Sequence, residues 1–126
     1  MSEQRPRGQA ITFWGLSIFV GLAFLASGGL KLLGAKQLAQ NFARWGYPAW
    51  FLPVVGVIEV VGAIATVLPR TRFYGAALLT GTMVGAVATH LRFGEIAESV
   101  PSLVLGVICA ILAWGHRPAF LRAARP

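Results

Sequence analysis

Four long apolar stretches, separated by short polar segments, dominate the chain. They cover residues 10–33, 50–68, 73–91 and 99–115. A helix that crosses a membrane needs about 20 apolar residues, whereas a membrane strand needs about 10 residues that alternate in polarity. Because these stretches are long and do not alternate, the pattern predicts an all-α fold, an integral membrane four-helix transmembrane bundle.

The longest connection, residues 34–49, has a pattern of its own. Leu38, Phe42 and Trp45 recur at helical spacing, with polar residues on the other faces. This spacing predicts a short interfacial helix on the membrane surface, and Pro48 ends it because proline disfavours helix in the residue before it. The segment is either an ordinary amphipathic connector or a lid over a pocket that opens outward.

Composition supports the membrane interpretation. The chain has 126 residues, of which 56% are hydrophobic and 12% are charged, and its mean hydropathy is +0.70. These charges are too few to cover the surface of a small soluble domain, so we expect one transmembrane domain over residues 1–126. The single cysteine, Cys109, excludes a disulfide within the chain and a CxxC redox pair.

The net charge of +7 bears on how the chain is oriented in the membrane. The basic residues lie in the gaps between apolar stretches, which is typical of topology signals rather than of nucleic-acid binding. We therefore expect the lipid bilayer as a partner and no nucleic acid. Basic residues favour the side that carries both termini, which predicts cytoplasmic termini and, in a bacterium, the inner (cytoplasmic) membrane. That side carries Arg5, Arg7, Arg70, Arg72, Arg117, Arg122 and Arg125, against Lys31, Lys36, Arg44 and Arg92 on the other.

Glu59 is the most informative polar residue, because it lies at the middle of the second stretch. A carboxylate at that depth costs several kcal/mol unless it is paired, hydrated or protonated. Lys31 is the expected partner, and Ser27 lies on the same helix face, four residues earlier. Two interpretations stay open for Glu59, a structural ion pair that fixes helix packing and a ligand or proton site. Lys31 itself could equally extend outward to water.

His90 closes the third stretch at the same outer side as Lys31. One histidine without further ligands at metal spacing is a weak metal signal, so we expect no metal site and assign no catalytic residue. Lys31, Glu59 and His90 come from three helices and could converge below the outer surface. The alternative is an ordinary interfacial histidine.

Small residues recur every fourth position in the third stretch, at Ala77, Gly81, Gly85 and Thr89. Such a stripe lets another helix approach closely. The approaching helix could belong to the same chain or to a second copy in a homo-oligomer.

Four segments together resemble the DoxX-like family of small membrane proteins: residues 24–32, 42–48, 55–63 and 85–90. The resemblance covers about residues 10 to 117. It implies a four-helix membrane bundle related to a subunit of a thiosulfate:quinone oxidoreductase, and it places the family's polar membrane residues at Lys31, Glu59 and His90.

Three functional hypotheses follow. The first is an accessory, redox-associated subunit, not an enzyme by itself, that binds a quinone-like or lipid-like molecule and works with membrane or periplasmic redox partners. Under this hypothesis, quinone is the only cofactor that we expect. The second is a small proton-coupled exporter like the small multidrug resistance transporters, although their buried glutamate belongs in the first helix and a lysine would repel a cation. The third is a membrane assembly or chaperone factor without a small-molecule site.

Overall fold

The computed structural model describes residues 5–123, and within that range it contains helices and no strand. The predicted all-α class is therefore confirmed, and the four apolar stretches and the connector each form a helix. The fourth long helix begins three residues earlier than predicted, and a short helix follows it in the basic tail. The helices are α1 (Arg7–Leu32), α2 (Lys36–Arg44), α3 (Phe51–Val67), α4 (Arg72–Arg92), α5 (Ile96–Gly115) and α6 (Ala119–Ala123).

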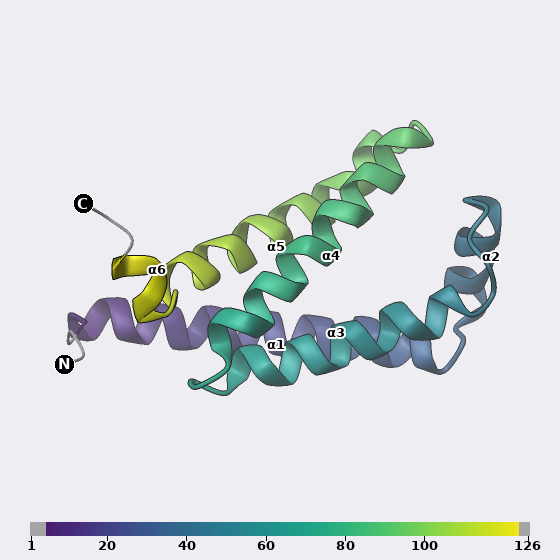
Figure 1. The fold of residues 1–126 in the computed structure, drawn as a ribbon. Coiled ribbons are helices and arrows are strands. Elements are labelled where there is room, and N and C mark those ends of the chain that lie inside the picture. The colour runs from purple at the N-terminus through teal and green to yellow at the C-terminus, as the bar shows by residue number, and fades with distance from the viewer. Residues whose placement is uncertain (1–4, 124–126) are drawn as a thin grey trace.

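The four long helices form two pairs, α1 with α3 and α4 with α5 (Figure 1). The pairs meet where the short turn 68–71 joins α3 to α4, and they diverge toward the opposite end, where α2 lies. We call this wider end the α2 end. The beginning of α1 and the short α6 lie together at the other end, as an even number of long helices that alternate in direction requires.

Glycines set the spacing where helices touch. A Cβ on Gly28 would lie 2.7 Å from the backbone oxygen of Gly56, and a Cβ on Gly56 would lie 2.9 Å from that of Gly28. A Cβ on Gly75 of α4 would lie 2.7 Å from the backbone oxygen of Gly62 on α3. The backbone of α3 is thus approached by that of α1 at one point and by that of α4 at another, more closely than side chains would permit.

The apolar core is small and lies near the junction of the helix pairs. Its members come from α1, α3, α4 and α5, and Cys109 is one of them. The buried cluster consists of Val20, Phe24, Ala63, Ala76, Leu79, Met83, Cys109 and Leu112.

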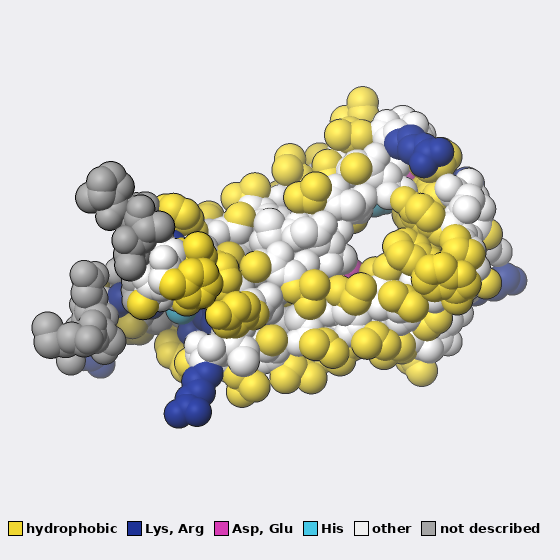
Figure 2. All heavy atoms as spheres, viewed as in Figure 1, with side chains coloured by type: hydrophobic (Ala, Val, Ile, Leu, Met, Phe, Trp, Pro, Cys, Tyr) yellow, Lys and Arg dark blue, Asp and Glu magenta, His cyan; other side chains and the backbone are white. Residues whose placement is uncertain are grey.

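Most large apolar side chains point away from this core (Figure 2). Among the described helices, α1 and α5 are long and apolar enough to cross a membrane, and only 22% and 17% of their most apolar windows are buried inside the protein. Helix α3 is apolar but has 17 residues, and the threonines, glycines and terminal arginines of α4 lower its hydropathy. Of the four expected spans, two described helices are therefore candidates by length and composition.

Candidate functional site

A cavity of about 710 Å³ lies between the two helix pairs, toward the α2 end. Its walls are mostly apolar, with side chains from every helix except α6. Figure 2 shows the corresponding hollow, which passes through the molecule between the pairs. The cavity exists because the pairs diverge here and no side chain fills the space between them.

Three polar side chains form a hydrogen-bonded group in the wall of this cavity. The Lys31 ammonium donates to Ser27 Oγ at 2.7 Å and to Glu59 Oε1 at 2.9 Å. The Ser27 hydroxyl donates to the same carboxylate oxygen at 2.8 Å. The Glu59 side chain is 2% exposed and that of Lys31 is 12% exposed, so this ion pair is buried. We call these three residues the polar triad.

Local sequence explains why the triad forms. Ser27 and Lys31 are four residues apart on α1 and therefore share one face. Gly28, on the same turn, removes the side chain that would separate α1 from α3, since its Cβ would lie only 3.0 Å from that of Glu59. Lys31 and Glu59 are thus in direct contact, as predicted. This contact gives the mid-helix carboxylate of Glu59 a cationic partner.

The triad is electrically neutral but still has hydrogen-bonding capacity. An ammonium has three N–H donors. Among the described residues, Lys31 uses two of them, on Ser27 and Glu59. Because all three triad residues line the cavity, the remaining donor can serve an acceptor that enters it. An uncharged carbonyl or hydroxyl oxygen suits this site best, because it adds no unpaired charge to a buried position.

Helix α2 covers the cavity at its wider end, as the lid hypothesis for residues 34–49 requires. Leu38, Phe42 and Trp45 line the cavity, so the predicted apolar face of this helix points inward. Tyr47 and Phe51 continue the lining, and their rings lie 5.0 Å apart. These aromatic side chains form an apolar roof beside the triad.

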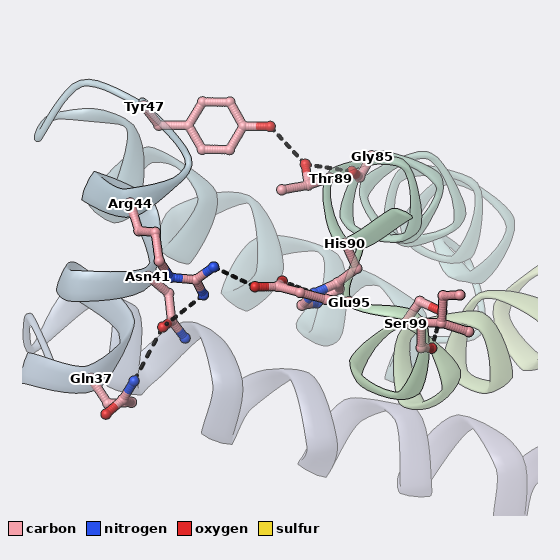
Figure 3. A network of polar contacts seen from close by, with 10 residues as sticks. Gln37, Asn41, Arg44, Tyr47, Gly85, Thr89, His90, Glu95 and Ser99 are labelled. Atoms are coloured by element: carbon pink, nitrogen blue, oxygen red, sulfur yellow. Dashed lines mark hydrogen bonds and ion pairs between the residues drawn. The ribbon is translucent and has the colours of Figure 1, made fainter. Parts of the chain in front are cut away.

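Polar contacts tie this roof to the opposite helix pair (Figure 3). The Arg44 guanidinium on α2 binds Glu95 Oε2, and His90 Nδ1 lies 2.9 Å from Glu95 Oε1. Tyr47 and Thr89 hydroxyls lie 2.6 Å apart. We call these five residues the latch, because together they connect α2 and the turn after it to α4 and the α4–α5 turn.

The structure places His90 differently from the other predicted site residues. Its side chain lines the same cavity as Lys31 and Glu59, but its ring nitrogen contacts Glu95, and its ring lies 5.3 Å from that of Trp45. The convergence of three residues is therefore a convergence of Ser27, Lys31 and Glu59, with His90 in the latch.

The stripe of small residues on α4, which we call the glycine stripe, lies beside the cavity. A Cβ on Gly81 or Gly85 would have no neighbouring atom within 4 Å, so no described helix packs against these positions. Ala77, Gly81 and Gly85 line the cavity instead. Of the two alternatives left open for the stripe, packing against a described helix of the same chain does not occur at Gly81 and Gly85, and α4 approaches α3 closely at Gly75 instead.

Sequence reasoning missed most of the latch. From the sequence, Arg44 is only one of the basic residues on the outer side, and Glu95 and Tyr47 receive no role. The available signal was charge complementarity between two segments predicted on the same outer side. It could not be read as contact, because the separation of those segments depends on how far the helix pairs diverge.

The latch predicts a response to acid. Hydrogen bonds from His90 and then from Arg44 hold the pKa of Glu95 below its usual value of 4.5. A lowered pKa means that Glu95 contributes stability that is complete above pH 4.5 and is lost as pH falls through the folded value. We expect wild type to lose more thermal stability than Glu95→Gln between about pH 5 and pH 3.

Thermal unfolding in detergent micelles across this pH range measures the difference. Glu98→Gln is the matched control, because Glu98 is exposed and lies one turn further along α5. This control should keep the wild-type profile. An equal acid loss in Glu95→Gln and wild type would show that the latch carboxylate does not stabilise the fold.

The site offers no arrangement for a metal ion. Among residues 5–123, no group of three His, Cys, Asp or Glu side chains is placed to hold one. The polar groups that line the cavity include the buried ion pair, several hydroxyl groups, the Asn41 amide and the His90 imidazole.

Comparisons with known proteins identify the family of this chain. The model of the DoxX-like family matches residues 15–112, which include the triad and all five residues of the latch. The chain is 26% identical to the uncharacterized protein YdgD of Bacillus subtilis, over 78% of this chain and 88% of that protein. It is also 26% identical to the uncharacterized protein YwoB of the same organism, over 73% of this chain and 59% of that protein. No solved structure matches. Since the family model spans most of the sequence, the chain belongs to the DoxX-like family.

Proposed function

We propose that this protein is a four-helix integral membrane protein whose cavity binds a quinone-like or lipid-like molecule. The observation that carries the proposal is a neutral polar triad in the wall of a mostly apolar cavity of about 710 Å³. Small-molecule sites are typically concave and apolar, with a few placed polar groups. On this proposal the protein is one transmembrane domain over residues 1–126 that serves as an accessory, redox-associated subunit.

Surface chemistry supports the membrane setting. Large apolar side chains on all four long helices are exposed, including Leu22 at 65%, Val61 at 54%, Val84 at 64% and Val107 at 50%. In water such a surface would associate, whereas lipid chains cover it without cost. The excess of arginine at the end opposite α2 favours a cytoplasmic position for that end, with α2 and the cavity toward the outer side.

The proposed ligand follows from the triad. An acceptor oxygen on the ligand would take the third N–H of Lys31, while the apolar walls and aromatic roof would enclose its body. A quinone carbonyl has this character, and so do the ester and hydroxyl groups of lipids. An exported cation fits less well, because Lys31 already neutralises Glu59. Any electron transfer to a bound quinone would require a membrane or periplasmic redox partner.

Native mass spectrometry of the protein in nanodiscs supplied with a short-chain ubiquinone tests the proposal. Wild type should retain the quinone or a specific lipid, and Glu59→Gln should retain at least tenfold less, because Lys31 then lacks its counter-charge and its fixed position. Glu98→Gln is the matched control and should bind as wild type does.

Other results would favour the alternatives. Equal retention by Glu59→Gln and Glu98→Gln would contradict a triad-dependent site. Proton-linked cation export that Glu59→Gln abolishes would favour the exporter. A change in stability alone, with no adduct in wild type, would favour the assembly factor.

A further inference from the structure

We infer that the ligand enters the cavity sideways, from the hydrocarbon interior of the membrane, through an opening between α3 and α4. We call this opening the lateral window. Leu78, Gly81 and Gly85 form its α4 edge, and Val55 and Ile58 line the cavity from α3. This inference rests on the proposed function and adds the source of the ligand, a molecule dissolved in the bilayer.

The first support is that no other described helix packs against the glycines at the α4 edge. Gly81 and Gly85 line the cavity and yet are exposed at the surface, and a Cβ at either position would have open space around it. Leu78, one turn earlier, lines the cavity and is 43% exposed. A helix edge that is both cavity lining and outer surface is the border of an opening.

The second support is the direction of that opening. In Figure 2 the hollow leads through the molecule between the two helix pairs, across their long axes. In Figure 1 the helices on the viewer's side of this gap are α3 and α4. Val84 on α4 is 64% exposed beside the window, and Val57 on α3 is 50% exposed. If the long helices span the bilayer, the window therefore faces lipid chains.

The third support is that the cavity is closed at both of its ends. At the α2 end, the aromatic roof covers the cavity, and the latch connects it to α4 and the α4–α5 turn through the Arg44–Glu95 and Tyr47–Thr89 contacts (Figure 3). At the opposite end, the cavity stops at Phe24 and Met83, which belong to the buried core. With both ends covered, the sides remain for a molecule to pass.

A lateral window also narrows the class of ligand that the cavity would bind. The ligand is a neutral amphiphile with an acceptor group that reaches Lys31 and an apolar tail. The cavity, at about 710 Å³, lies within the range of small-ligand pockets. A long tail would therefore extend through the lateral window into the lipid. The glycines at the α4 edge leave room for that passage.

Collision accessibility of a spin label tests the window without any ligand. The label is placed by Thr82→Cys in a Cys109→Ala background, because Thr82 lines the cavity and is half-buried. Molecular oxygen concentrates in hydrocarbon and a nickel chelate stays in water. We expect oxygen to relax the label at least threefold more strongly than the chelate in liposomes, as at the lipid-facing control Val84→Cys.

Two results would overturn the inference. If the label behaves like the aqueous control Lys36→Cys, with the chelate dominant, the cavity fills from water. If neither reagent reaches the label, the window is covered, as it would be by a helix of a second copy on the glycine stripe.

Blocking the window provides an independent measurement. Gly81→Leu should lower uptake of short-chain ubiquinone from nanodiscs at least tenfold, whereas Gly15→Leu should leave it unchanged. Gly15 is the matched control because it is also an exposed helical glycine with open space around it, outside the cavity lining. Equal uptake by both variants would overturn the lateral route.

The two proposals can fail separately. Absence of quinone uptake in wild type, with an oxygen-accessible label at position 82, would reject the proposed ligand and keep the window. Quinone uptake in wild type, with a chelate-accessible label, would keep the ligand and reject the window.

Discussion

Lys31→Met should destabilise the protein by about 3–5 kcal/mol, because it leaves the Glu59 carboxylate buried without its cationic partner. Among residues 5–123, only the Ser27 hydroxyl would remain to bind that carboxylate. The free energy of unfolding in mixed micelles, followed by circular dichroism, measures the loss. Lys36→Met is the matched control, since Lys36 is exposed on α2, and it should change stability by less than about 0.5 kcal/mol.

The double variant Lys31→Met/Glu59→Leu separates pairing from packing. Replacing both members of a buried ion pair by apolar residues of similar size is often nearly neutral, so most of the lost stability should return. If the double variant loses as much as the sum of the two single variants, the two side chains are not energetically coupled. A stable double variant that no longer retains ubiquinone would assign the pair to binding rather than to folding.

Gly75→Ala should cost about 3 kcal/mol, because α4 cannot move away from α3 without disturbing the junction of the helix pairs. The new Cβ would lie 2.5 Å from the backbone nitrogen of Thr66 and 2.7 Å from the backbone oxygen of Gly62. These are backbone atoms, so no side chain can rotate to relieve the clash. The same unfolding measurement in micelles gives the value.

Gly81→Ala on the same helix is the matched control. Its Cβ would meet nothing within 4 Å, so the intrinsic preference of helices for alanine should make this variant more stable by up to about 1 kcal/mol. Opposite signs for the two substitutions would confirm that α4 contacts α3 at Gly75 and not at the stripe. Equal destabilisation would mean that a helix also packs against Gly81.

Much of the local structure could be predicted from the sequence, because it depends on neighbours along the chain. The apolar runs set the positions of the four long helices, since their length and lack of alternation leave no other regular structure. The spacing of Leu38, Phe42 and Trp45 predicted α2 and its apolar face. The pairing of Lys31 with Glu59 was also accessible, because an unpaired mid-helix carboxylate is costly and the long side chain of Lys31, toward the outer end of its helix, could bend inward to reach it.

The rest was decided by the tertiary structure, through the angle between the two helix pairs. A glycine stripe has the same sequence pattern whether a helix packs on it or a cavity opens beside it, so only the divergence of α4 from α3 gives Gly81 and Gly85 their place. The same divergence leaves His90 apart from the triad. His90 contacts Glu95, five residues further along the chain, and Glu95 in turn binds Arg44. Helix crossing angles arise from many small side-chain contacts summed along two surfaces, and no single position in the sequence records that sum.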